Sequence, residues 1–177
     1  MSYSSAIDEL AKTTARRTIS VTIPEGLSRS ETADVVAAAG IPGDYMDATV
    51  KVPGFDPNEY GAQGRAENLE GFLFPATYEL KPSADVNDLV EQQLQAFEDN
   101  IAGVNMKYAK SKNLTVYDVL TIASMVEREV SIPSERKTVA AVIYNRLKMG
   151  EPLGIDATIR FALDNWTEPL TESDLAT

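Results

Sequence analysis

The hydrophobic periodicity changes once along the chain, and this change most constrains the fold. Residues 18–23 alternate β-branched and polar side chains, the period-two pattern of a half-buried strand. From residue 85 onward apolar residues recur at helical spacing in three segments, 89–97, 116–130 and 134–149. In a chain of 177 residues, long enough to bury a core, this order predicts an α+β fold.

Helix-end signals follow the predicted strand. Ser28 is a candidate N-cap and Glu31 occupies the capping-box position, while the segment 40–43 (Gly-Ile-Pro-Gly) ends the helix. Residues 51–68 are rich in Pro, Gly, Asn and Asp, which predicts a long surface loop. The predicted organisation is therefore a polar lead-in (1–16), a small α+β subdomain with a loop insertion (17–80) and a helical region (81–177).

The composition limits the chemistry. The chain has no cysteine and no histidine, which excludes Ser-His-Asp and Cys-His catalysis and nearly every common zinc site. It shows no Gly-rich phosphate loop or metal-binding Asp loop, so neither a metal nor an organic cofactor is predicted. A net charge of -11 argues against nucleic acid and against anionic lipid surfaces as partners. Carboxylates remain the best catalytic candidates.

One carboxylate stands out in the segment 116–130. Thr115 is its candidate N-cap, with Asp118 placed against the helix N-terminus. On a helical wheel Glu127 falls inside the apolar arc, whereas Glu129 lies on the polar face. The arc consists of Ile122, Val126, Val119, Val130, Ala123, Val116 and Leu120. Desolvation raises the pKa of a carboxyl, as a general acid requires; the alternatives are fraying of the helix or a structural pair with an arginine.

The next helical segment carries two arginines beside its apolar stripe. The stripe consists of Val139, Val142, Ile143 and Leu147. Arg136 and Arg146 project on or beside it. Such side chains commonly lay their stems over apolar surface. The functional alternative is that one of them orients a carboxylate or a saccharide oxygen.

These segments resemble a known family. Ile-Ala-Ser-Met-Val-Glu-Arg-Glu at 122–129, Ser-Glu-Arg at 134–136 and Val-Ala-Ala-Val-Ile-Tyr-Asn-Arg-Leu at 139–147 resemble the central block of the YceG-like (MltG) endolytic transglycosylases. Val-Thr-Ile-Pro-Glu-Gly at 21–26 and Leu-Glu-Gly-Phe-Leu-Phe-Pro-Ala-Thr-Tyr at 69–78 resemble its two earlier motifs. The resemblance covers residue 18 to the end.

The resemblance implies a LysM-like subdomain followed by a lysozyme-like catalytic region, outside the cytoplasmic membrane and anchored by one span absent from this chain. Members of the family cleave the MurNAc-GlcNAc β-1,4 bond of nascent peptidoglycan strands, leave 1,6-anhydro-MurNAc ends and act beside cell-wall synthases. Glu127 matches the catalytic first Glu of the family's Val-Glu-x-Glu pattern. The chain ends before the family's Tyr-Asn-Thr-Tyr segment, so an incomplete C-terminal region is expected.

Four further positions match the family's motifs and are implied to bind substrate: Asn145, Asp156, Glu70 and Tyr78. A local interpretation stands beside each, such as an N-cap role for Asp156. Gly154 and Ala157 depart from the Gln and Pro usual in the family. Two other functions stay open: a non-catalytic peptidoglycan-binding or scaffold module, and a hydrolase that uses Glu127 with Asp156.

Overall fold

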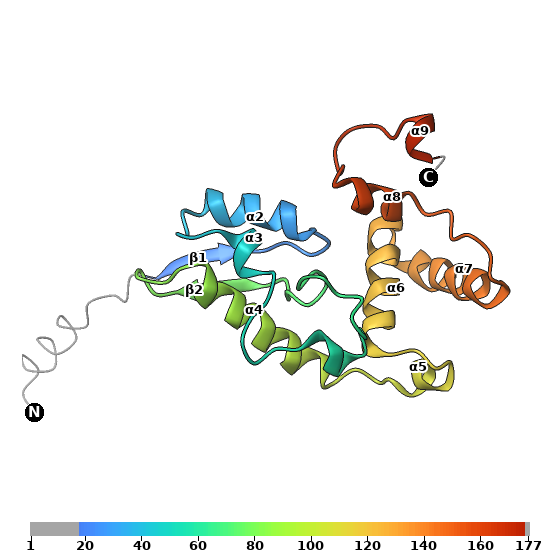
Figure 1. Ribbon diagram of the computed structural model, residues 1–177, viewed down its shortest axis with the longest axis horizontal. Coiled ribbons are helices and arrows are strands. Elements are labelled where there is room, and N and C mark those ends of the chain that lie inside the picture. Colours follow the sequence, from blue (N-terminus) through green and yellow to red (C-terminus); the bar gives the residue numbers. More distant parts are fainter. Residues whose placement is uncertain (1–17, 176–177) are drawn as a thin grey trace, which may run out of the picture. The chain divides into compact units, whose positions relative to one another are not determined.

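The computed structural model describes residues 18–175, which form two compact units (Figure 1). The first unit comprises the described residues up to Pro53 together with Phe72–Ile101, and the second comprises Gly54–Gly71 and the described residues from Ala102 onward. The fold is mixed α+β, as predicted. The division differs from the expected boundary near residue 80, because each unit takes in a segment from the other side of it. The predicted lead-in, 1–16, lies outside the described residues.

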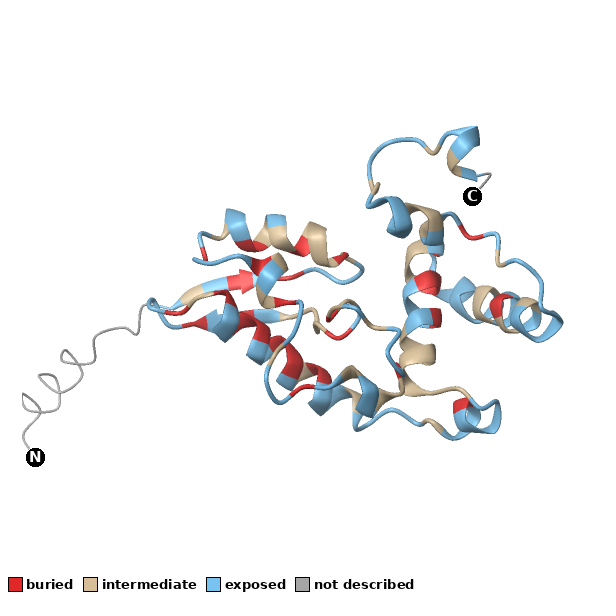
Figure 2. Cartoon of the chain, viewed as in Figure 1, coloured by how far each residue is buried: buried red, intermediate tan, exposed pale blue. Residues whose placement is uncertain are grey.

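A two-stranded antiparallel sheet anchors the first unit. Strand β1 (Ile19–Thr22) pairs with β2 (Thr77–Leu80), so that the buried side chains of Val21 and Tyr78 lie opposite each other. Helices α2 (Arg29–Ala38), α3 (Tyr45–Ala48) and α4 (Val86–Ile101) complete the unit. Leu89 on α4 is fully buried, and Figure 2 shows many buried positions along this helix. The first unit therefore has a closed apolar core.

The start of α2 was predicted correctly. The Ser28 hydroxyl accepts the Glu31 backbone N–H at 3.2 Å, and the Glu31 carboxylate accepts the Ser28 N–H at 2.8 Å. This reciprocal pairing satisfies two of the N–H groups that a helix start leaves without a partner. The helix ends at Ala38, just before Gly40, whose φ of 72° suits glycine.

The second unit is helical within the described residues. Its elements are η1 (Pro57–Tyr60), α5 (Lys107–Ser111), α6 (Val116–Glu129), η2 (Pro133–Glu135), α7 (Arg136–Met149), α8 (Asp156–Leu163) and α9 (Glu172–Leu175). Thr115 and Asp118 form the capping box of α6, as their spacing predicts. A cluster around α6 forms the core: Ile122, Met125, Val126, Val130, Ile143 and Ile155.

The segment 54–71 is tied to the N-terminus of α6. Arg65 donates to the carboxylate of Asp118 at 2.8 Å and to the carbonyl oxygens of Gly61 and Ala62. Gly61 has a φ of 87°, and a Cβ placed on it would lie 2.4 Å from the Cβ of Thr115. A side chain at this position does not fit. This loop therefore belongs to the helical unit, although it precedes β2 in the chain.

Helices α7 and α8 are largely exposed, as Figure 2 shows. Ile143 is the one buried residue of α7, and α8 has none. Two members of the predicted α7 stripe, Val142 and Leu147, are 44% and 47% exposed. Among residues 18–175, no helix combines the length and hydrophobicity that crossing a membrane requires.

Candidate functional site

Glu127 lies in the last turn of α6 and pairs with the first residue of α7. The Arg136 Nη2 atom is 3.1 Å from one carboxylate oxygen of Glu127 and 3.3 Å from the other. The Glu127 side chain is 37% exposed. The expectation of a desolvated carboxyl in an apolar groove is therefore wrong for this chain. The alternative that an arginine pairs with Glu127 is confirmed.

The orientation of α6 explains this correction. Its buried residues are Ile122, Met125 and Val126, and the predicted apolar arc did not include Met125. With about 100° of rotation per residue, Met125 shifts the buried face away from Glu127. Ala123, which the arc included, is exposed. Glu127 therefore lies at the margin of the core, while Glu129 is exposed, in agreement with its predicted hydration.

The two arginines of α7 have different roles. Arg146 donates to the carbonyl oxygen of Leu153, in the turn after α7. Arg136 pairs with Glu127 instead. The contact of Arg136 fits the interpretation that one arginine orients a carboxylate, whereas the backbone hydrogen bond of Arg146 was not among the interpretations of the sequence.

Three of the implied substrate residues lie in the second unit. Asn145 is exposed on α7, and Glu70 is partly buried in the loop, where its backbone N–H donates to Asn68 Oδ1 at 2.9 Å. Asp156 is exposed and is the first residue of α8. The N-cap of α8 is Ile155, without a side-chain hydrogen bond. The N-cap interpretation of Asp156 is therefore wrong, and the residue lines a cavity instead.

Tyr78 lies in the first unit, inside its core. Tyr78 is 6% exposed, and its hydroxyl donates to the carbonyl oxygen of Phe74 at 2.5 Å. Burial raises the pKa of this phenol to about 12. The hydroxyl thus keeps its proton and serves as a hydrogen-bond donor within the unit.

A cavity of about 230 Å³ lies in the second unit beside the C-terminus of α6. It is lined by Arg128, Glu129, Asp156, Ala157, Arg160 and Trp166. The Arg128 guanidinium lies 4.0 Å from the centre of the Trp166 ring, a cation-π contact. Arg160 donates to the carbonyl oxygens of Asn165 and Glu168 at 3.2 and 3.0 Å. In this group the sequence analysis singled out Glu129, Asp156 and Ala157.

The sequence contains a local signal that places Arg160 beside Asp156, because Arg160 follows it by one helical turn and shares its face of α8. Trp166 had none: its contact with Arg128 depends on how α6 and α8 pack. Within the described residues, no group of three or more His, Cys, Asp or Glu side chains is arranged to hold a metal ion.

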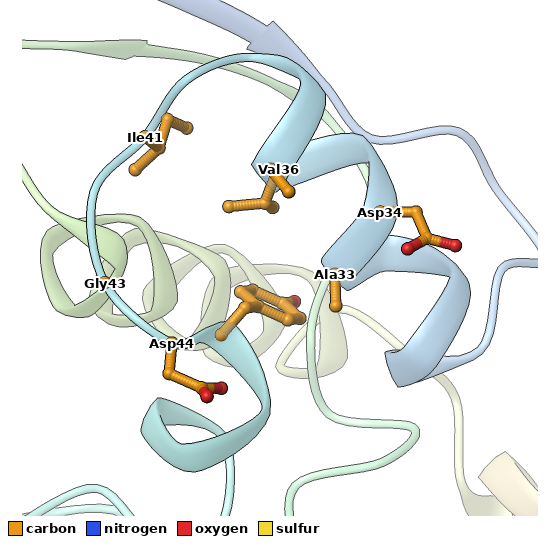
Figure 3. A pocket seen from close by; sticks show the side chains of 8 residues that line it. Ala33, Asp34, Val36, Ile41, Gly43 and Asp44 are labelled. Atoms are coloured by element: carbon orange, nitrogen blue, oxygen red, sulfur yellow. The ribbon is translucent and has the colours of Figure 1, made fainter.

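A second cavity, of about 320 Å³, lies in the first unit beside α2 and α3 (Figure 3). Figure 3 shows Val36 projecting from α2 toward this space and Asp34 pointing away from it. Asp44 caps α3 by accepting the Asp47 N–H at 3.1 Å, and the Tyr45 hydroxyl donates to Gln93 at 2.9 Å. The side chains of Asp44 and Tyr45 are thus engaged in the fold.

Comparison with known proteins relates the chain to one protein family. The model of the YceG-like family matches residues 1–177. A crystal structure of a yceG-like protein from Listeria monocytogenes superposes with a TM-score of 0.74 at 26% identity, covering 100% of this chain and 62% of that one.

Two curated proteins with the name endolytic murein transglycosylase are also similar. The protein from Streptococcus pneumoniae strain R6 is 43% identical over 99 residues, which are 56% of this chain and 18% of the relative. The protein from Bacillus subtilis is 32% identical over 108 residues, 60% of this chain and 30% of the relative. The chain thus spans less than a third of either relative.

Proposed function

This chain belongs to the YceG-like family, and we propose that the protein containing it is an endolytic peptidoglycan lytic transglycosylase with Glu127 as its acid and base. The observation that carries the proposal is the state of the Glu127 carboxylate. It is partly exposed, so a substrate can reach it, and a single arginine nitrogen holds both of its oxygens. The same residue occupies the family's Val-Glu-x-Glu motif.

In the proposed reaction one carboxyl acts twice. Protonated Glu127 donates its proton to the glycosidic oxygen of the MurNAc-GlcNAc bond while the bond from that oxygen to C1 breaks. The N-acetyl group of the substrate stabilises the positive charge that develops at C1. The C6 hydroxyl oxygen then attacks C1, and its proton passes to the Glu127 carboxylate. The acid is regenerated and a 1,6-anhydro-MurNAc end forms without water.

Arg136 positions the acid in this cycle. One of its nitrogens lies 3.1 and 3.3 Å from the two carboxylate oxygens of Glu127, and this contact restricts the orientation of the carboxylate. The side chain of Arg136 is 46% exposed, so it has room to adjust when a substrate binds.

The two units receive different roles in this proposal. The order β1, α2, α3 and β2, with antiparallel strands, supports a LysM-like subdomain in the first unit. The second unit is the lysozyme-like catalytic region. Asn145, Glu70 and Asp156 bind the glycan or its substituents there, and Tyr78 supports the first unit. The whole protein is held at the outer face of the cytoplasmic membrane by an anchor, beside cell-wall synthases.

Product analysis tests the proposal. The full-length protein is incubated with purified sacculi, and the released and retained muropeptides are identified by mass spectrometry. New 1,6-anhydro-MurNAc ends are expected. Reducing ends would instead favour a hydrolase that uses Glu127 with Asp156. Binding to sacculi without any new ends would favour a non-catalytic binding or scaffold module.

A further inference from the structure

We propose that the cavity lined by Arg128, Glu129, Asp156, Ala157, Arg160 and Trp166 binds the charged part of the peptide stem of peptidoglycan rather than its neutral sugars. The inference rests on the proposed function, because it names the part of the substrate that this cavity recognises. Arg128 and Glu129 directly follow Glu127 in α6. A stem held here would therefore bring the attached glycan toward the reacting carboxyl.

The charge of the lining points to an ionic ligand. Four of the six lining residues are charged, two arginines and two acids, so the lining is formally neutral in a chain whose net charge is -11. A ligand that matches both signs carries a carboxylate and an amine. The sugars of peptidoglycan carry neither in free form, whereas its peptide stems carry both.

The aromatic wall also argues against a sugar. Sugars stack on an open aromatic face, but the Arg128 guanidinium covers a face of Trp166 at 4.0 Å. A guanidinium stacked in this way keeps its N–H groups in its plane, where they suit a carboxylate. Arg160 fixes the segment that bears Trp166 through the carbonyl oxygens of Asn165 and Glu168. The cationic wall is thus held in place before a ligand arrives.

One of the two acids lies at the N-terminus of a helix and the other at the C-terminus of a helix. Asp156 begins α8, where the helix dipole stabilises a negative charge. Glu129 ends α6, where the dipole disfavours one. Both side chains belong to exposed residues, so a ligand can reach them. An ammonium group bound between them would offset the unfavourable position of Glu129.

The size of the cavity limits what enters it. Pockets for drug-sized ligands have volumes of about 300–1,000 Å³, and this cavity has about 230 Å³. One or two amino-acid residues fit this volume, but a whole stem does not. The proposed ligand is therefore the γ-D-Glu–L-Lys part of the stem, with the free α-carboxylate of D-Glu toward Arg128 and the side-chain amine of L-Lys toward Asp156 and Glu129.

Binding of defined probes tests the inference without any bond cleavage. The peptide N-acetyl-L-Ala-γ-D-Glu-L-Lys-D-Ala-D-Ala, whose N-terminus is blocked as it is in peptidoglycan, and the neutral tetramer of N-acetylglucosamine are titrated into the ¹⁵N-labelled chain. Amide shifts are followed by NMR. We expect the peptide to shift the amides of the cavity residues. Asp156→Asn and Arg128→Gln should each weaken peptide binding by about tenfold or more, because each removes a charge-assisted hydrogen bond.

Matched controls remove the same charges outside the cavity. Glu135→Gln and Lys137→Gln change exposed residues of the same unit and should leave the affinity for the peptide unchanged. Circular dichroism of each variant verifies that the fold is kept. Equal peptide affinity in all variants would overturn the inference, and so would tetramer binding that the cavity variants weaken to the same extent.

This result is independent of the reaction. If the full-length protein produces no anhydro ends but the cavity variants still lose the peptide, the proposed function fails and the peptide site stands. If anhydro ends form but the peptide binds all variants alike, the site fails and the function stands.

Discussion

The two units differ in how completely their apolar side chains are buried. In the first, side chains of β2, of α4 and of the segment before β2 are fully buried, among them Leu80, Leu89 and Phe72. In the second, the described residues bury a smaller cluster around α6, while Val142, Leu147 and Phe161 stay about half exposed. The residues proposed for chemistry lie in the second unit. The comparison indicates that the first unit supplies stability and the second presents accessible side chains.

Truncating one leucine in each unit should give the largest difference in stability. Leu89→Ala in α4 removes a side chain that is 0% exposed and should cost about 2–5 kcal/mol. Leu147→Ala in α7 removes one that is 47% exposed and should cost about 1 kcal/mol or less. Denaturant unfolding followed by circular dichroism measures both costs. Equal costs would mean that the second unit is as closely packed as the first.

Substitutions of two glycines in the second unit distinguish the cost of close packing from the cost of backbone strain. Gly61 and Gly71 both have positive φ, 87° and 84°, but only Gly61 has a neighbour, Thr115, within 4 Å of the added Cβ. Gly61→Ala should therefore destabilise the unit by about 1–3 kcal/mol more than Gly71→Ala. Thermal unfolding of both variants gives the difference. If the two costs are equal, the loop does not pack on α6 as described.

A substitution of Arg136 should lower activity with little effect on stability, whereas Leu89→Ala in α4 should mainly lower stability. Arg136→Gln leaves Glu127 without the nitrogen that holds it, and a misplaced acid should lower kcat of the full-length protein about 10- to 100-fold. Because a single nitrogen contacts both oxygens, Arg136→Lys should recover most of the loss. Lys137→Gln is the control for charge. A purely structural role predicts lost stability and no rescue by lysine.

The smallest effect concerns acid stability. Burial raises the pKa of Asp118, but hydrogen bonds from Thr115 and Arg65 outweigh it and hold the pKa below its ordinary value of 3.8. Since the folded pKa is lowered, this contribution is complete above pH 3.8 and is lost as the pH falls through the folded value. Asp118→Asn should cost about 1 kcal/mol at neutral pH and less in acid.

Urea unfolding of Asp118→Asn at several pH values, with Asp34→Asn on α2 as the control, measures this dependence. The cost of the α2 substitution should stay small throughout. A cost of Asp118→Asn that does not shrink toward low pH would contradict the proposed role of its charge.

Local patterns predicted the local structure. Both capping boxes follow from residues three apart, Ser28 with Glu31 and Thr115 with Asp118, because their contacts form within one turn. The strand β1 and the helices α2, α4, α6 and α7 follow likewise from periodicity. The strand β2 did not, since residues 69–80 mix aromatic and turn residues and pair only through a distant partner, β1.

Tertiary contacts decided the rest. The buried face of α6 includes Met125, and this depends on what packs against the helix rather than on its own sequence. The Glu127–Arg136 pair spans the turn between α6 and α7, and the Arg128–Trp166 contact spans α6 and the segment after α8. The wheel therefore selected the same glutamate as the family motif but assigned it the wrong environment.

Muropeptide analysis of matched variants of the full-length protein tests the central claim most directly. Glu127→Gln keeps the size of the side chain and removes its acid, so new anhydro ends should fall by about 10²- to 10⁴-fold. Glu135→Gln, an exposed neighbour in the same unit, should form them at the rate of the unchanged protein. Undiminished formation of anhydro ends by a folded Glu127→Gln variant would contradict the assignment.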